Sequence, residues 1–141
     1  MAFYEELMDD VVKASYQERL ALGKKTLEDM ISVCIKNDIS RDDATKIISG
    51  LMSLYLSMMD TDVRYSIEFI NNMTGINYSE ESINEMKENG KDEKLFELLK
   101  DILDCFPSDE KTPFCLFGLA LMACDGKLND SEKELFVKLS I

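Results

Sequence analysis

Length, composition and charge already narrow the classes of protein to which this chain can belong. It has 141 residues, of which 45% are apolar and 31% charged, so we expect a single soluble domain with a core of its own. The formal net charge of −12 argues against nucleic acid as a partner, because binding to phosphates needs clustered Lys and Arg. Histidine is absent, which removes the commonest general base and most catalytic zinc sites.

The sequence also indicates where the protein is located in the cell. The longest apolar run, residues 114–124, is shorter than the roughly 20 residues that span a bilayer, and residues 1–10 are acidic, unlike a secretory leader. We therefore expect a cytoplasmic protein without direct membrane insertion.

The cysteines show neither a CxxC pair nor zinc spacing, and each has apolar neighbours. We expect four buried free thiols, Cys34, Cys105, Cys115 and Cys124.

Apolar residues at spacings of three and four predict an all-α fold, a compact bundle of seven or eight short helices. The first helix is expected over 3–20, with a break at Gly23 and a second helix to about residue 36. Ser40 is the expected cap of a helix over 41–59. Capping and breaking residues delimit three more helices: one from Val63 to Gly75, one from Ser79 to Gly90, and one that Asp92 caps and Pro107 ends.

The stretch 113–139 is expected to form the central helix of the fold, a tight turn and the last helix. Thr112 is expected to cap a helix that starts at Pro113, and its apolar run has no polar face, so other helices should wrap it. Gly126 fits the left-handed residue that ends a helix. Asn129 and Glu132 then have the spacing of a capping box for the last helix.

A segment similar in sequence to this stretch lies 65 positions upstream. Residues 51–60 match residues 116–125 at four of ten positions, and the match includes Asp60 with Asp125. The pattern predicts a pseudo-two-fold repeat of helix, Asp turn and helix, with copies near 44–73 and 113–139. Its two apolar helices would pack side by side in the core.

Convergence of the two Asp turns would gather oxygen ligands for a hard cation such as Ca²⁺ or Mg²⁺. The candidate metal ligands are Asp125, Asp130, Glu132, Asp60 and Asp62. The alternative is that these carboxylates hydrogen-bond exposed amides at helix ends. Both interpretations stay open at this point.

The middle of the chain is strongly acidic, which suggests a docking surface for a basic partner beside the default of a solvated face. Its carboxylates are Glu80, Glu81, Glu85, Glu88, Asp92, Glu93 and Glu97. Nothing in the sequence separates two carboxylates into acid and base, and no glycine-rich loop could cradle phosphate. We therefore expect a non-catalytic protein.

The motif around the Asp125 turn resembles the signature of the TerB-like (tellurite-resistance TerB) superfamily. The matching positions are Ala123, Asp125, Gly126, Leu128, Asn129 and Glu132. The first copy agrees at Asp60 and Val63 and departs at Thr61 and Ile67, where the family has glycine and glutamate. The resemblance covers roughly 25–141, so residues 1–24 form a family-atypical N-terminal helix within a single domain.

This resemblance implies a cytoplasmic all-helical module of stress- or tellurite-resistance systems, working with membrane-associated partners and with acidic motif residues proposed to bind metal. The leading hypothesis is therefore a non-catalytic interaction module for a protein partner and a divalent cation. One alternative is an acidic immunity or inhibitor protein that neutralises a basic toxin by charge complementarity. The other is a metal-dependent enzyme that uses clustered carboxylates.

Overall fold

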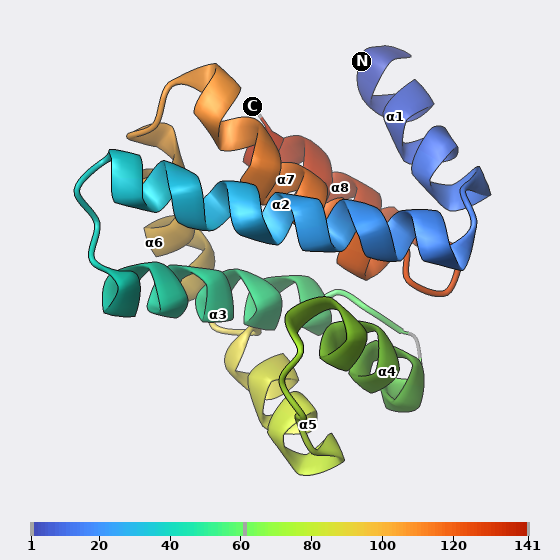
Figure 1. The fold of residues 1–141 in the computed structure, drawn as a ribbon. Helices are drawn as coiled ribbons and strands as arrows, with labels where there is room; N and C mark the ends of the chain where they lie inside the picture. The colour runs from blue at the N-terminus through green and yellow to red at the C-terminus, as the bar shows by residue number, and fades with distance from the viewer. Residues whose placement is uncertain (1, 61, 141) are drawn as a thin grey trace.

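The computed structural model describes residues 2–60 and 62–140, and every regular element in these ranges is an α-helix (Figure 1). The all-α bundle expected from composition and periodicity is confirmed. The helices are α1 (Ala2–Lys13), α2 (Tyr16–Lys36), α3 (Arg41–Ser57), α4 (Val63–Thr74), α5 (Glu80–Asn89), α6 (Glu93–Asp104), α7 (Ser108–Met122) and α8 (Asp130–Ser140).

Helix α7 forms the centre of the bundle, as its apolar sequence predicts. Helix α2 runs along it, and α1, α3, α4, α6 and α8 contact it from other sides. Figure 1 shows α2 crossing in front of α7 and α8, with α3 beside it and α4 and α5 beyond. The segment 117–124 is completely enclosed, with exposed fractions of 0–1% for its non-glycine side chains. Burial of this apolar surface is the main stabilising contribution to the fold.

The apolar helices of the predicted repeat, α3 and α7, pack against each other. Tyr55 of α3 lies across Gly118 of α7, and its hydroxyl donates a 2.8 Å hydrogen bond to the carbonyl oxygen of Phe114. Its ring also meets Phe117 edge-on at a centroid distance of 6.4 Å. Gly118 is needed here, because a Cβ at this position would lie 2.1 Å from the Tyr55 ring.

Local capping signals place most of the helix ends. The hydroxyls of Ser40 and Ser79 accept hydrogen bonds from amides in the first turns of α3 and α5, and the Asp92 carboxylate does the same for α6. Gly75 ends α4 in the left-handed region, with φ of 73°. These four boundaries agree with the sequence predictions.

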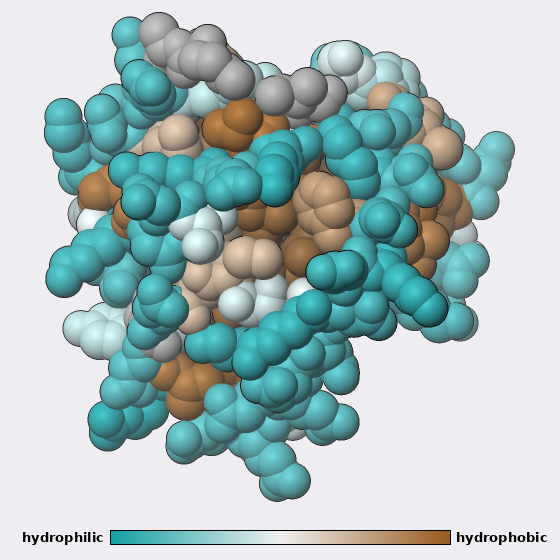
Figure 2. Space-filling model, turned by 180° about the vertical axis from the view of Figure 1, so that it is seen from behind, coloured by the Kyte–Doolittle hydropathy of each residue, from teal (hydrophilic) through white to brown (hydrophobic). Residues whose placement is uncertain are grey.

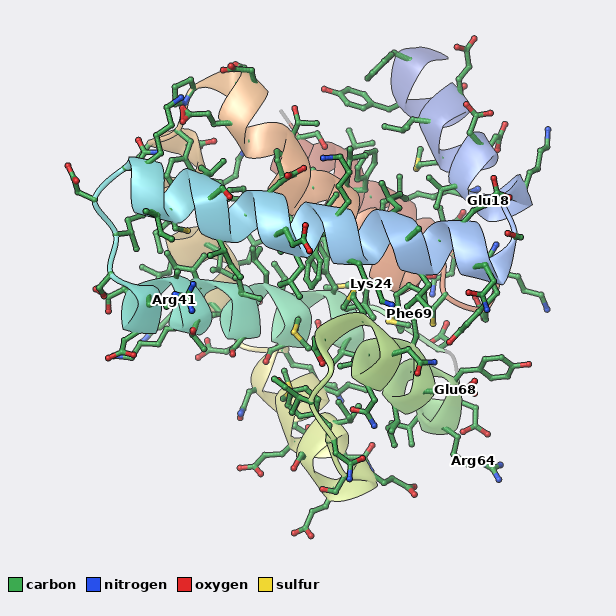
Figure 3. The ribbon with its side chains drawn as sticks, viewed as in Figure 1. Glu18, Lys24, Arg41, Arg64, Glu68 and Phe69 are labelled. Atoms are coloured by element: carbon green, nitrogen blue, oxygen red, sulfur yellow. The ribbon has the colours of Figure 1, made fainter. Side chains whose placement is uncertain are left out.

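The predicted break at Gly23 is wrong. Ser15 and Glu18 form a capping box that starts α2, so the first two helices separate at residues 14–15. Gly23 lies inside α2, where a Cβ would meet the Met73 sulfur at 2.6 Å. Here glycine permits the close approach of α4 rather than ending a helix. Figure 3 shows Phe69 of α4 directed toward α2 at this crossing.

Two further predictions need correction. Helix α7 begins at Ser108, so Pro113 lies inside it and Thr112 donates to the Ser108 carbonyl oxygen instead of capping the helix. Pro107 precedes this helix, and Asp109 and Glu110 add negative charge to its first turn. Cys105 is exposed at the end of α6, whereas the other three cysteines are buried. The position of Cys105 after the last turn removes it from the apolar face of α6.

Candidate functional site

The two Asp turns meet in the structure, and Asn129 joins them. Its side-chain amide donates to the carbonyl oxygen of Met58 at 3.1 Å and to the carboxylate of Asp60 at 3.3 Å. Both groups belong to the turn between α3 and α4. The predicted convergence of the turns is therefore correct, although the register of 65 holds only for the first helix of each pair. Helices α3 and α7 end 65 residues apart, whereas α4 and α8 begin 67 apart.

Glu132 closes this junction from α8. Its Oε1 accepts from the Asn129 amide at 2.8 Å, and its own amide donates to the Asn129 side chain at 2.7 Å, which is the predicted capping box. The side chain is only 3% exposed. Its other oxygen, Oε2, is buried without a hydrogen-bond donor among the described residues.

Burial is the largest influence on Glu132 and raises the pKa of its carboxyl group to about 7. The negative charges of Asp125 and Asp60 act in the same direction. The hydrogen bond from the Asn129 amide and the positive charge of Lys87 oppose them without cancelling the shift. Glu132 consequently holds its proton to a higher pH than an exposed glutamate does.

Two basic residues that belong to no sequence motif also border the junction. Lys87 of α5 donates to the carbonyl oxygen of Met59 at 2.7 Å. Arg19 of α2 is buried, donates to the carbonyl oxygens of Val12 and Ala14, and approaches the position that a Cβ of Gly126 would occupy. No spacing rule could have found them, because they reach the turns from distant helices.

Asp62 and Asp130 do not join the other candidate ligands. Asp62 caps α4 through the Arg64 amide at 2.9 Å and pairs with the Arg64 guanidinium at 3.0 Å, and these hydrogen bonds lower the pKa of its carboxyl group. Figure 3 shows Arg64 pointing away from the bundle. Asp130 is exposed at the start of α8. For Asp62 the helix-capping interpretation is therefore the correct one.

The remaining candidates are Asp60, Asp125 and Glu132, grouped around Asn129. Asp125 accepts a hydrogen bond from the Lys127 amide at 3.1 Å, which shapes the turn after α7. Within residues 2–60 and 62–140, no three or more Asp, Glu, Cys or His side chains are arranged to hold a metal ion. The described geometry thus accounts for much of the acidic motif as turn and cap structure.

A groove of about 480 Å³ opens beside this junction, between the end of α3, the start of α6 and helix α8. Met58 connects the two features, because it lines the groove and also accepts the hydrogen bond from Asn129. The apolar lining residues are Leu54, Met58, Phe96 and Leu135, and the carboxylates are Asp92, Glu93, Glu97 and Glu134. Figure 2, which shows the molecule from behind, has hydrophobic side chains exposed among hydrophilic ones on this face.

Neither a family model nor a curated protein nor a solved structure matches this chain. In the part of the chain that the structure describes, no helix is both long and apolar enough to cross a membrane. The Asp turns and the groove beside them are the surface features on which a function can rest.

Proposed function

We propose that this chain is a non-catalytic interaction module that binds a basic protein partner through its acidic turns and the adjoining groove. The observation that carries the proposal is the position of an apolar groove, bordered by carboxylates, next to the junction of the two Asp turns. Apolar contacts supply affinity at such a surface, and complementary charge supplies attraction and specificity. The net charge of −12 favours a basic partner over an acidic one.

The roles of the polar groups at the junction support binding rather than turnover. Glu132 and Asn129 cap each other, and Asn129 holds the neighbouring turn. Lys87 donates to a backbone carbonyl group rather than to an acidic side chain. These groups hold the two turns in one arrangement, as expected for a rigid recognition surface.

The resemblance to TerB-like proteins gives this proposal a biological setting. Two copies of helix, Asp turn and helix, with the turns in contact, are compatible with the motif that carries the resemblance. We accordingly place the protein in a cytoplasmic stress- or tellurite-resistance system with a membrane-associated partner, as a function argued by analogy. An immunity protein against a basic toxin is the alternative that the same groove and charge support.

The identity of the bound partner tests these assignments. We expect the full chain, purified from its native cells, to retain a basic protein that moderate salt releases, because exposed ion pairs are screened. A charge-reversed variant, Glu93→Lys with Glu97→Lys, should lose that protein. A membrane-associated stress protein would support the leading assignment, and a toxin inhibited by the chain would support the alternative. Retention of the same partner by wild type and variant, regardless of salt, would contradict the proposal.

A divalent cation is a second candidate ligand, suggested by the motif resemblance and by the buried Oε2 of Glu132 near the charges of Asp60 and Asp125. Among the described residues these carboxylates do not form a metal-binding group of three, so a cation would have to draw them together. The test is thermal unfolding in EDTA and in millimolar Ca²⁺, Mg²⁺ or Mn²⁺, for wild type and for Asp125→Asn. A ligand at 100 times its dissociation constant stabilises by about 2.7 kcal/mol, which raises the melting temperature by several degrees. We expect an ion-specific rise that the variant loses. Equal melting temperatures in EDTA and in every cation would remove the cation from the proposal.

A further inference from the structure

The floor of the groove is an apolar strip built by three helices. Leu54 comes from α3, Phe96 from α6 and Leu135 from α8, and Met58 extends the strip toward the Asp turns. Leu54 and Leu135 are almost fully buried, whereas Met58 and Phe96 are half-buried and accessible. A volume of about 480 Å³ is large enough for apolar side chains of a partner.

The charge of the rim is uneven. Lys91 is neutralised by Glu88 at 2.7 Å, and Lys138 by Glu134 at 2.8 Å. Glu93 and Glu97, one helical turn apart on α6, are exposed and have no ion-pair partner among the described residues. The α6 wall therefore carries uncompensated negative charge, which selects Lys or Arg on the facing side of a partner.

Backbone hydrogen bonding favours a helical occupant. The groove lies between helices, whose backbone groups are paired within each helix, so its apolar floor offers no strand edge to an extended peptide. An extended segment would lose water from its own amides without replacement, which costs free energy. A helix satisfies its backbone groups internally and can present apolar anchors spaced along one face.

The same charges disfavour a second copy of this chain as the occupant of the groove. Two chains that each carry a net charge of −12 repel each other, and the first helix of a second copy would add Glu5, Glu6, Asp9 and Asp10. The occupant has to be positively charged where it meets α6. A basic amphipathic helix meets both requirements of the groove.

We infer that the groove between α3, α6 and α8 binds one amphipathic helix of a basic partner, with apolar side chains on Met58 and Phe96 and Lys or Arg side chains against Glu93 and Glu97. This inference rests on the proposed function and specifies the part of the partner that is recognised. It places the specificity of the module beside the Asp turns, in a surface that those turns hold in position.

The test uses a fluorescent amidated peptide of leucine and lysine whose leucines repeat at helical spacing, titrated with the full chain. Fluorescence anisotropy measures its affinity for wild type, for Glu93→Gln with Glu97→Gln, and for Phe96→Ala. We expect each groove variant to weaken binding about tenfold, the fold-change that corresponds to about 1.4 kcal/mol. The matched control, Glu80→Gln with Glu81→Gln, removes the same charge from α5 away from the groove and should bind within about twofold of wild type.

A second peptide, with the same composition but no apolar face, separates shape from charge. We expect it to bind more weakly and to be insensitive to Phe96→Ala. The inference would be overturned if the two glutamate pairs weakened binding equally, or if both peptides bound alike. If the peptide test fails in this way but the chain purified from its native cells still retains a partner that salt releases, the proposed function stands without this inference. If the peptide test and the partner test both fail, the inference and the proposed function are both overturned. Circular dichroism checks that Phe96→Ala is folded, and the exposed glutamate variants supply the same test if it is not.

Discussion

At the scale of single residues, Glu132 carries a conflict between its role as a cap and its surroundings. Its Oε1 is held by the Asn129 amide, while burial and the charges of Asp60 and Asp125 disfavour ionisation. A carboxylate in this position costs free energy when charged, because the buried Oε2 receives no hydrogen bond from the described residues. The geometry of the turns is therefore maintained at a cost that depends on pH.

This conflict predicts that stability falls as pH rises across the range in which Glu132 ionises. The folded state has a pKa of about 7 against an ordinary value of 4.5, so it holds a proton that the unfolded state has already released between those values. The contribution of this group is full below about pH 4.5 and is lost as pH rises through about 7. Urea unfolding between about pH 5.5 and 8 measures the slope.

Glu132→Gln should remove this slope and raise the unfolding free energy at pH 8 by about 1–3 kcal/mol, because each pKa unit is worth about 1.4 kcal/mol. Glutamine keeps an oxygen for the Asn129 amide and carries no charge that would have to be buried beside Asp60 and Asp125. Asp130→Asn is the control, since it removes an exposed charge from the same helical turn. Identical slopes for wild type and Glu132→Gln would contradict the prediction.

Cysteine reactivity is a second property decided residue by residue. Cys105 is exposed, whereas Cys34, Cys115 and Cys124 are buried, and burial raises the pKa of Cys124 to about 12. We expect one fast-reacting thiol in the native chain and four in urea. Titration with a chromogenic disulfide measures both numbers. Cys105→Ser should abolish the fast reaction, and a fast reaction that survives this change would contradict the described burial.

At the scale of elements, small residues set how closely the helices approach. Gly118 lets the Tyr55 ring lie against α7, and Gly23 lets Met73 of α4 lie against α2. Gly90 is closer still, because a Cβ there would lie 1.8 Å from the carbonyl oxygen of Ser53. Gly50 differs, since a Cβ at that position would make ordinary contacts of 3.5 Å with Leu99.

Two glycine substitutions in helices should therefore have opposite effects. Gly50→Ala should stabilise the protein by about 0.5–1 kcal/mol, because alanine reduces the backbone entropy lost on folding. Gly118→Ala should destabilise it by about 1–3 kcal/mol, because the buried Tyr55 ring has no space to move. Chemical denaturation of both variants against wild type is the measurement. A stabilised Gly118→Ala would show that the packing of α3 on α7 is looser than described.

At the scale of the whole molecule, charge opposes the compact state. The net charge is −12, and several of the described ion pairs are exposed pairs within one helix, such as Lys25 with Asp29 and Lys138 with Glu134. Pairs of this kind contribute little to stability. Lys111 with Asp104 is different, because the lysine is buried and the 2.8 Å pair joins α7 to α6.

Screening this repulsion should stabilise the protein. We expect the unfolding free energy at pH 7 to rise by about 1 kcal/mol between low salt and about 0.5 M NaCl, because long-range repulsion weakens more than the few exposed pairs lose. Near the isoelectric point of about 4.4 the gain should disappear. A fall in stability with salt at pH 7 would mean that ion pairs outweigh the net charge.

Local chemistry explains why the sequence predicts most of the fold. Caps such as Ser40 and Asp92, the left-handed Gly126 with φ of 81°, and the box of Asn129 with Glu132 depend on residues within one turn. They can therefore be predicted from the order of residues alone. The apolar helix at 114–124 can be predicted too, because a segment without a polar face has to be surrounded.

Contacts between distant segments decided the rest, because helical period and capping rules carry no information about them. The hydrogen bond from Asn129 to Asp60 spans 69 residues, and that from Lys87 to Met59 spans 28. The burial of Glu132 and the role of Gly23 likewise follow from how the helices pack. The acidic motif was visible in the sequence. Only the packing of the helices divides it into a buried junction and exposed caps, and only the meeting of α3, α6 and α8 forms the groove beside it.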